Sequence, residues 1–259
     1  MKQPLAYIHP DAKIASTVVI EPFVTIDKNV VIGEGTQIGS NVTILEGVRI
    51  GKNCKIFPGA VIGAVPQDLK FNGEDTLAVI GDNTTIRECV TINRGTASKG
   101  KTVVGNNCLI MAYCHVAHDC VVGNNVILGN ATQLAGEVEI DDFAILSGAC
   151  LVHQFTRIGS HVMIQGGSKI GKDVPPFVTA GREPLSYAGI NSIGLRRRGY
   201  TNEQIRDIQD VYRYIYLSGM NTSHAVERVQ AELPATKERD EILLFVKNSP
   251  RGIIKGYFD

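Results

Sequence analysis

The stretch IASTVVIEPFVTIDKNVVIGEGTQIGSNVTILEGVRI, residues 14–50, carries an isoleucine at every sixth position. The same phase starts at Ile8 and, with two interruptions, continues as isoleucine, valine or leucine to Ile170. Helices bury side chains at a period near 3.6 and strands at a period of 2.0, so a period of six indicates one short strand and one corner in each repeat. The chain is therefore expected to wind as a prism.

Hexapeptide repeats of this kind indicate a parallel β-helix. One repeat cannot bury its own apolar face, so successive repeats stack and enclose a continuous core. Three faces per turn give a coil of about 18 residues, with the strands of adjacent coils ~4.8 Å apart. A second small or β-branched residue follows each of these isoleucine, valine or leucine positions by four residues and must also point inward. The sequence thus predicts an all-β solenoid.

The repeat is interrupted near residues 63–79 and 93–103, where inserted loops are expected. Loops that leave a rigid scaffold often carry function. The first loop holds Gln67, Asp68 and Lys70, three polar side chains able to bind hydroxyls or a phosphate. A solvated excursion without function explains the same residues equally well.

The residues after Ile170 change from the six-residue repeat to a helical period. Two prolines in KDVPPFV, residues 172–178, stop the repeat, and Thr201 with Gln204 forms a capping box ahead of a helix with one apolar face. We therefore expect a β-helix over residues 1–175 and a small C-terminal α-helical domain over residues 176–259. These helices would cover the open end of the prism or its side, because a bare last coil leaves strand edges exposed.

Charge and hydropathy argue against several classes of partner. The 26 basic residues balance 26 acidic ones, which disfavours nucleic acid or an anionic membrane as the main partner. No apolar run approaches the roughly 18 residues of a membrane span, and the N-terminal MKQPLAYIHP lacks the build of a secretory signal. The sequence predicts a cytoplasmic protein with no membrane span.

The six cysteines are expected to serve packing rather than chemistry. Five of them occupy the inward position for small residues, and cysteines six residues apart fall on different faces of a prism. We expect no metal and no other cofactor. A γ-class carbonic anhydrase would need three histidines converging on zinc, which the spacing of the histidines does not supply. A non-enzymatic ice-binding solenoid would need a ladder of outward threonines, whereas the outward positions here are charged and irregular.

One outward column carries candidate chemistry. Residues one 18-residue coil apart lie above one another, and one such column reads His118, Gly136, Gln154. An imidazole suits a general base near neutral pH, a glycine opens a notch at its backbone N–H, and a glutamine supplies an amide donor. Asp119 could hold one ring nitrogen of His118. A lone surface histidine is more simply explained as solvated, but the column favours a site.

A second candidate is the basic run Arg196–Arg198, at the end of a short helical segment starting near Asn191. Guanidinium groups match phosphate oxygens, so the run could hold a diphosphate or an acidic protein. A solvated basic helix end, which the helix dipole favours, explains the run equally well.

Several segments together resemble those of one enzyme family. They are QDLK (67–70), IRECVTINRGT (86–96), HVAHDCVVGN (115–124), DDFAILSGACLVHQF (141–155), DVPPFV (173–178) and GINSIGLRRRGY (189–200). Over essentially its full length the chain resembles the UDP-N-acetylglucosamine O-acyltransferases, which perform the first step of lipid A synthesis. HVAHDC and VHQF are the specific motifs, whereas the hexapeptide repeat is shared by many acyl- and acetyltransferases.

The resemblance implies a fold, an assembly and a mechanism. The fold would be a left-handed parallel β-helix of hexapeptide repeats, assembled as a homotrimer with active sites between subunits. His118 would be the general base that deprotonates the sugar 3-hydroxyl as it attacks the thioester of an (R)-3-hydroxyacyl acyl carrier protein. Asp119 would orient the imidazole, and the N–H of Gly136 would stabilise the oxyanion.

The resemblance also implies a set of substrate-binding residues. The side chains expected to hold the sugar, the pyrophosphate or the acyl 3-hydroxyl are Asp68, Lys70, His153 and Gln154, and the wider binding set adds Gln67, His115 and Glu137. Asn191 and Arg198 match positions near the nucleotide, and Arg197 matches a contact with the carrier protein.

Gly166 matches the position whose bulk sets the length of the acyl chain in this family. A glycine there leaves the groove deep, which implies a long chain of about 14 carbons or more. The sequence departs from the family pattern at Glu137, where the enterobacterial enzymes carry a histidine, and at Asn93.

Other activities on the same scaffold remain open at the level of sequence. They are the related N-acyltransferase that acts two steps later and a CoA-dependent sugar acetyltransferase. A Ser-His-Asp or Cys-His hydrolase is less favoured, because Ser147 and Ser168 lie on other faces and the cysteines point inward.

Overall fold

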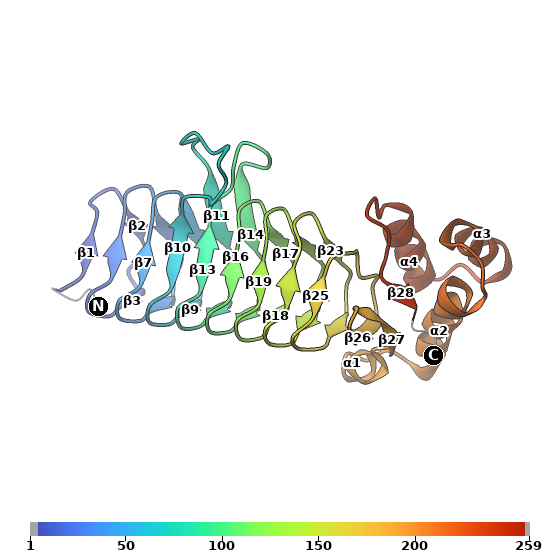
Figure 1. The fold of residues 1–259 in the computed structure, drawn as a ribbon. Coiled ribbons are helices and arrows are strands. Elements are labelled where there is room, and N and C mark those ends of the chain that lie inside the picture. The colour runs from blue at the N-terminus through green and yellow to red at the C-terminus, as the bar shows by residue number, and fades with distance from the viewer. Residues whose placement is uncertain (1–4, 257–259) are drawn as a thin grey trace.

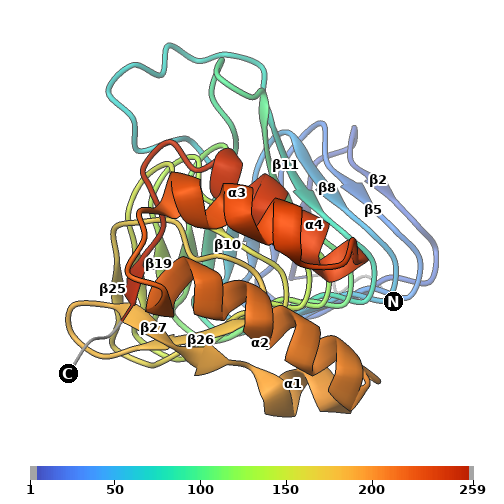
Figure 2. The same ribbon diagram turned by 90° about the vertical axis from the view of Figure 1, so that its right-hand side faces the viewer.

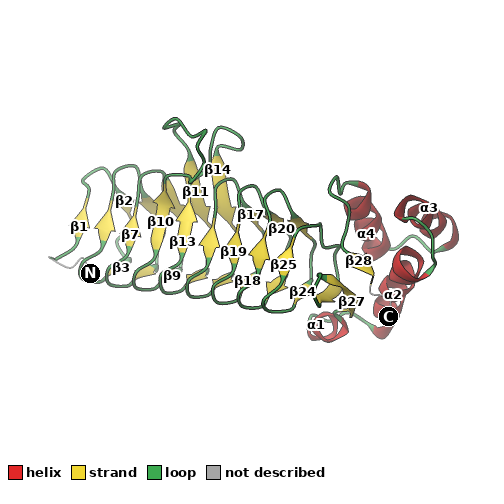
Figure 3. Cartoon of the chain, viewed as in Figure 1, coloured by secondary structure: helices red, strands yellow, loops and turns green. Residues whose placement is uncertain are grey.

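The computed structural model describes residues 5–256 and shows a prism of short parallel strands (Figures 1 and 3). Three sheets form its faces. The nine-stranded sheet contains β1 (Tyr7–Ile8), β4 (Thr25–Ile26), β7 (Thr43–Ile44), β10 (Val61–Ala64), β13 (Thr91–Asn93), β16 (His115–Val116), β19 (Gln133–Leu134), β22 (Leu151–Val152) and β25 (Lys169–Ile170). The eight-stranded sheet contains β2 (Lys13–Ile14), β5 (Val31–Ile32), β8 (Val48–Ile50), β11 (Leu77–Ile80), β14 (Lys101–Val104), β17 (Val121–Val122), β20 (Glu139–Ile140) and β23 (Arg157–Ile158). The eleven-stranded sheet contains β3 (Val19–Ile20), β6 (Gln37–Ile38), β9 (Lys55–Ile56), β12 (Thr85–Ile86), β15 (Leu109–Ile110), β18 (Ile127–Leu128), β21 (Ile145–Leu146), β24 (Met163–Ile164), β26 (Val178–Gly181), β27 (Ser186–Ile190) and β28 (Lys255–Gly256).

The strands stack in register, one coil above the next. His115 pairs with Gln133 and Gln133 pairs with Leu151, a spacing of 18 residues that confirms the predicted coil. The isoleucine, valine or leucine of each repeat and the residue four positions later are buried almost throughout. Together they form one core along the axis of the prism. Five cysteines are buried in this core, while Cys89 is exposed. Packing of the inward side chains therefore holds the coils together.

Two loops interrupt the coils without breaking the stack. Val61 pairs with Thr91 and Thr91 pairs with His115, although these partners are 30 and 24 residues apart rather than 18. The extra residues form loop 65–76, between β10 and β11, and loop 94–100, between β13 and β14. Both loops rise side by side from one edge of the prism (Figure 1), and backbone hydrogen bonds join their bases.

The prism has three edges, each formed by a column of corners. The first edge joins the nine-stranded to the eight-stranded sheet and includes residues 117–120, 135–138 and 153–156. The second edge joins the eight-stranded to the eleven-stranded sheet and includes residues 123–126, 141–144 and 159–162. The third edge closes the coil and includes residues 129–132, 147–150 and 165–168. Many corners have a positive φ at their second turn residue, as at Asp119 (60°) and Asn125 (58°), a conformation that Asp and Asn tolerate.

The C-terminal part of the chain closes one end of the prism. β26 continues the eleven-stranded sheet parallel to β24, and β27 then pairs antiparallel with β26. Four helices follow: α1 (Ser192–Arg197), α2 (Asn202–Leu217), α3 (Thr222–Glu232) and α4 (Lys237–Lys247). They lie across the end of the coils (Figure 2), and the capping box of Thr201 and Gln204 at the start of α2 is confirmed. None of the helices within residues 5–256 is long and apolar enough to span a membrane.

Candidate active site

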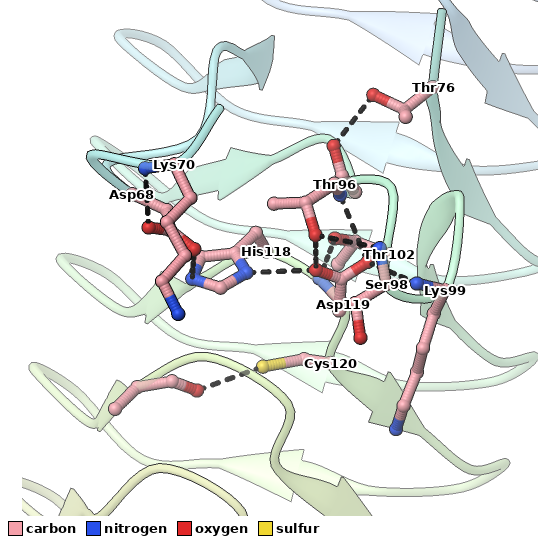
Figure 4. A network of polar contacts seen from close by, with 12 residues as sticks. Asp68, Lys70, Thr76, Thr96, Ser98, Lys99, Thr102, His118, Asp119 and Cys120 are labelled. Atoms are coloured by element: carbon pink, nitrogen blue, oxygen red, sulfur yellow. Dashed lines mark hydrogen bonds and ion pairs between the residues drawn. The ribbon is translucent and has the colours of Figure 1, made fainter. Parts of the chain in front are cut away.

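The candidate active site lies on the first edge of the prism, beside the two inserted loops (Figure 4). His118 is the first turn residue of the corner between β16 and β17, and only 8% of its surface is exposed. Its Nδ1 lies 2.9 Å from Oδ2 of Asp119, the next residue. Because an ionised carboxylate only accepts hydrogen bonds, Nδ1 carries the proton and Nε2 presents a lone pair. The two residues are arranged as a base, His118, and a carboxylate, Asp119, that orients it.

The carboxylate of Asp119 is fully buried and accepts four hydrogen bonds. Oδ1 accepts from the backbone N–H groups of Thr96 (3.0 Å) and Lys99 (3.2 Å). Oδ2 accepts from the Thr96 hydroxyl (2.6 Å) and from His118. Burial raises the pKa of Asp119, but these hydrogen bonds outweigh burial and leave the pKa below its ordinary value. Asp119 is therefore ionised at neutral pH.

Gly136 occupies the next coil, in line with His118 as the 18-residue spacing predicted. The N–H of Glu137 donates to His118 O over 3.0 Å, which fixes the two corners in register. A Cβ at Gly136 would lie 2.5 Å from Nε2 and 2.6 Å from Cε1 of His118. The imidazole therefore fills the space that a side chain would need, rather than leaving an open notch. The N–H of Gly136 makes no hydrogen bond to any atom of residues 5–256, and Gly136 is buried beside the imidazole.

Loop 65–76 brings a second carboxylate to the imidazole. Oδ2 of Asp68 lies 4.0 Å from His118 Nε2, across the ring from Asp119. This distance is too long for a hydrogen bond, so a hydroxyl can approach both groups. Asp68 Oδ1 accepts the backbone N–H of Lys70 over 2.9 Å, which shapes the turn of the loop, while the side chains of Gln67 and Lys70 are exposed.

A groove of about 440 Å³ runs along the nine-stranded sheet from His115 to His153, beside the first edge. Nδ1 of His115 lies 2.7 Å from the hydroxyl of Thr91. Burial, and to a lesser extent the charge of His118, lower the pKa of His115, so this imidazole is neutral at pH 7. The groove is lined mainly by apolar atoms, which suits an acyl chain.

The upper end of the column is held by the C-terminal segment. The backbone oxygen of Gln154 lies 3.0 Å from His153 Nδ1 and 3.3 Å from Arg251 Nη1. The side-chain amide of Gln154 makes no hydrogen bond to residues 5–256, so it can serve a ligand. Glu137 is half-buried beside Gly136, with a φ of 59°.

Four other predicted site residues lie on different edges of the same chain. Nδ2 of Asn191 donates to His161 O (2.9 Å), and Nη2 of Arg198 donates to Phe143 O (3.1 Å), which places both residues at the second edge. Arg197 is exposed at the end of α1. Gly166 is exposed on the third edge. One copy of the chain therefore does not bring these residues to His118.

The sequence-based reasoning did not single out Thr96, Lys99 or Arg251. Thr96 and Lys99 lie in loop 94–100, which was expected as an insertion but received no role. The spacing held a signal, because Thr91 and His115 pair although they are 24 residues apart, six more than one coil. The extra residues leave the prism between β13 and β14, on the same edge as the corner of Asp119 and one coil before it. Asn93, where the sequence departs from the family pattern, is buried and its Nδ2 donates to Val65 O over 3.2 Å, which ties the two loops together.

A metal centre does not form from the residues that the structure describes. No group of three or more His, Cys, Asp or Glu side chains within residues 5–256 is arranged to hold a metal ion.

The sequence of this chain matches known protein families. Residues 173–254 match the family model described as UDP-N-acetylglucosamine O-acyltransferase, domain 2. Residues 101–136 match the bacterial transferase hexapeptide model, and residues 2–106 match the model of the GMPPB C-terminal domain. The chain is 48% identical over 199 residues to an acyl-[acyl-carrier-protein]--UDP-N-acetylglucosamine O-acyltransferase of Janthinobacterium sp., with 75% of this chain and 76% of that protein covered.

Solved structures agree with the sequence matches. A UDP-N-acetylglucosamine acyltransferase from Bacteroides fragilis superposes with a TM-score of 0.97 at 60% identity, over 98% of this chain and 100% of that one. The enzyme of the same name from Francisella novicida gives a TM-score of 0.96 at 44% identity, over 98% and 94%. The predicted fold, a left-handed parallel β-helix of hexapeptide repeats with a small C-terminal α-helical part, is confirmed. The chain belongs to the UDP-N-acetylglucosamine O-acyltransferase family.

Proposed function

We propose that this chain transfers an (R)-3-hydroxyacyl group from acyl carrier protein to the 3-hydroxyl of UDP-N-acetylglucosamine, the first step of lipid A biosynthesis. The curated relatives are named for O-acyl transfer from acyl-[acyl-carrier-protein] to UDP-N-acetylglucosamine, and the first edge offers the groups that such a transfer needs. The observation that carries the proposal is a histidine paired with a buried carboxylate and packed against Gly136, whose backbone N–H makes no hydrogen bond within residues 5–256.

His118 is the proposed general base. Nε2 takes the proton of the sugar 3-hydroxyl as that oxygen attacks the thioester carbonyl. The carbonyl oxygen becomes an oxyanion that accepts from the N–H of Gly136. When the C–S bond breaks, the imidazolium returns the proton to the sulfur of the carrier arm. Asp119 stays ionised and stabilises the imidazolium throughout.

The other residues of the first edge are proposed to hold the substrates. Asp68 lies 4.0 Å from Nε2, so adjacent sugar hydroxyls can donate one hydrogen bond to Asp68 and one to the base. Lys70 is proposed to bind the pyrophosphate, and Gln67 and Glu137 are proposed to lie beside the sugar. His115 and His153 line the apolar groove. These two residues and Gln154 are proposed to meet the acyl 3-hydroxyl.

We further propose that the active enzyme is a homotrimer with its sites between subunits. The residues expected near the nucleotide lie on the second edge, and Gly166 lies on the third, while His118 lies on the first. A prism that packs around a three-fold axis brings different edges of neighbouring copies together. Asn191 and Arg198 would then reach the nucleotide, Arg197 would face the carrier protein, and Gly166 would line the acyl groove. A solution mass near that of one chain, 28.0 kDa, would contradict this assembly.

The proposed reaction is tested by supplying each donor and acceptor separately. The purified protein is incubated with UDP-N-acetylglucosamine and (R)-3-hydroxyacyl carrier protein, and in parallel with acyl-CoA, and the product is analysed by mass spectrometry. The proposal predicts an O-acylated sugar nucleotide with the carrier protein as donor. Product formed only from acyl-CoA, or only on an amino-sugar acceptor, would assign the chain to one of the alternative transferases.

Mixed donors in the same assay test the acyl-chain position. With a glycine at residue 166 we expect the enzyme to prefer chains of about 14 carbons or more, because each buried CH₂ adds ~0.8 kcal/mol where the groove has room. A preference for short donors would contradict the assignment of Gly166. We place the reaction in the cytoplasm, where nucleotide sugars and acyl carrier protein are found.

A further inference from the structure

Thr96 contacts the catalytic pair from outside the repeat. It lies in loop 94–100 and is 8% exposed. Its backbone N–H donates to one oxygen of Asp119 and its hydroxyl donates to the other, so a single residue grips both oxygens of the carboxylate (Figure 4). The hydroxyl bond, at 2.6 Å, is shorter than the 2.9 Å between the same carboxylate oxygen and His118.

The direction of the Thr96 hydroxyl is fixed by the loop itself. The backbone N–H of Ser98 donates to Thr96 Oγ1 over 3.1 Å, so a lone pair of that oxygen is already used. The hydroxyl proton is left for Oδ2 of Asp119, which as a carboxylate has no proton to give. Thr96 is therefore a committed donor to the carboxylate rather than a hydroxyl free to rotate.

The loop that carries Thr96 is held from two further sides. The hydroxyl of Thr76, which is buried, donates to Gly95 O over 2.6 Å. The N–H of Lys99 completes the set on Asp119, and the ammonium group of Lys99 pairs with Glu139 at 2.7 Å. With four donors on its two oxygens, the carboxylate of Asp119 has one defined orientation.

We propose that Thr96 is a positioning residue for the acyl transfer, whose hydroxyl holds Asp119 in the orientation and charge state that keep His118 a base. This inference rests on the proposed function. It gives loop 94–100, which makes this coil six residues longer than a regular one, a role, because a regular coil would have no residue at this place.

Loss of the Thr96 hydroxyl has a predictable electrostatic sign. The titratable groups around the imidazole are Asp119 on its own corner, Asp68 on loop 65–76 and His115 on β16. A donor on Oδ2 withdraws negative charge from the oxygen that faces His118. Without that donor the carboxylate favours the imidazolium more strongly, so the base is protonated over a wider range of pH. The acid limb of the kcat/KM profile should then move to higher pH.

Three variants test the inference. Thr96→Val removes the hydroxyl at nearly constant volume, Thr96→Ser restores it, and Thr76→Val removes a different buried hydroxyl bond of the same loop. We expect Thr96→Val to lower kcat/KM by roughly 10-fold to 100-fold, the range for hydrogen bonds to charged groups, and to shift the acid limb upward. Thr96→Ser should return both quantities toward the wild-type values. Thr76→Val should lower the thermal unfolding midpoint while leaving the acid limb in place.

Each outcome decides between the two proposals. A Thr96→Val enzyme with the wild-type rate and pH profile would overturn the role of Thr96. So would a fall in rate without a shift of the acid limb, or a Thr96→Ser enzyme as impaired as Thr96→Val, because either result reduces Thr96 to a support of the loop. These results would leave the proposed function intact as long as the wild-type protein acylates the sugar nucleotide; failure of that reaction would remove both proposals together.

Discussion

The first and second edges of the prism use the same backbone turn in opposite ways. At the second edge, a side chain from each next coil covers the N–H of the first turn residue below it. In each of these hydrogen bonds a side-chain Oδ1 accepts a backbone N–H. Asp82 accepts from Lys52 (2.7 Å) and Asn106 accepts from Asp82 (2.7 Å). Asn124 accepts from Asn106 (2.9 Å) and Asp142 accepts from Asn124 (2.7 Å). This ladder pairs the backbone N–H groups that the turns leave without a partner, and its side chains link adjacent coils.

At the first edge the corresponding N–H of Gly136 is left uncovered, and an imidazole lies beside it. The third edge also leaves such groups uncovered, as at Gly148, but its corners between residues 111 and 168 carry no histidine, aspartate or glutamate. An unpaired turn N–H is therefore a general product of this fold. We propose that it serves as an oxyanion site only where the sequence places a base next to it, as at Gly136.

The largest loss of activity on the first edge, apart from removing the base, is expected for Asp119→Asn. The amide cannot accept from both Thr96 and His118 in the same way, and its NH₂ group favours the imidazole tautomer with the proton on Nε2. We expect kcat to fall roughly 10³-fold or more, since the wrong tautomer cannot act as the base. Steady-state acyl transfer measures this, with thermal unfolding as the control for folding. An unchanged kcat would show that the pair is only structural.

A smaller loss is expected for Gly136→Ala. The added Cβ would meet Nε2 of His118 at 2.5 Å, and the side chain of His118 can swing away more easily than backbone can move. The variant should therefore stay folded with the imidazole displaced, and a displacement of about 1 Å costs on the order of 10²-fold in kcat. Kinetics and unfolding measured on the same preparation check this. Full activity in the variant would place the reaction away from this corner.

The second edge makes a prediction about stability rather than rate. His161 is stacked between Phe143 and Phe177, at 4.9 and 5.6 Å between ring centroids, where the second edge meets the C-terminal part. Burial, and then the charge of Arg198, lower the pKa of His161 to about 4. The unfolded chain, whose histidines have a pKa near 6.5, therefore binds this proton more readily than the folded chain.

Stability should accordingly be complete above pH 6.5 and fall as the pH drops through 6.5 toward 4, by on the order of 2–3 kcal/mol from this group. The His161→Phe variant keeps an aromatic ring in the stack and should lose this part of the pH dependence. Unfolding midpoints between pH 4 and pH 7 measure the effect. Equal slopes in the wild type and the variant would exclude His161 as its source.

The smallest effect is expected for Asn124→Ala in the ladder of the second edge. It removes the acceptor for Asn106 N–H, and because this bond is exposed, water can replace the acceptor and the cost is about 0.5–1 kcal/mol. Acyl transfer should be unaffected, in contrast to Asp119→Asn. Chemical unfolding together with the transfer assay checks both parts. A large loss of activity without loss of stability would give the second edge a role in this chain's own chemistry.

The fold was predictable from sequence because a solenoid is nearly one-dimensional. Each coil contacts its neighbours, so a period of six in the isoleucines sets both the faces and the 18-residue register. The same register suffices to predict that His118 and Gly136 lie in line on adjacent coils. The division into two domains at residue 175 stays a prediction, since β26 continues the eleven-stranded sheet beyond that residue.

The sequence did not predict the parts of the site that lie outside the six-residue repeat or depend on side-chain rotamers. Thr96 and Lys99 reach Asp119 only through the conformation of an inserted loop, which tertiary contacts decide and no periodicity records. The space beside Gly136 was expected to be open and holds the imidazole, because rotamers do not follow from spacing. The placement of Gly166 and Arg198 on other edges follows from the register, but their function depends on an assembly of several copies.

The most direct test of the first-edge site is the rate of acyl transfer by His118→Ala at saturating substrates, compared with the wild type. The alanine variant keeps the corner and the loops but has no base. We expect a rate lower by roughly 10³-fold to 10⁴-fold, at least as large a loss as in Asp119→Asn, with the unfolding midpoint and the oligomeric mass unchanged. A His118→Ala enzyme that transfers the acyl group at the wild-type rate would contradict the account.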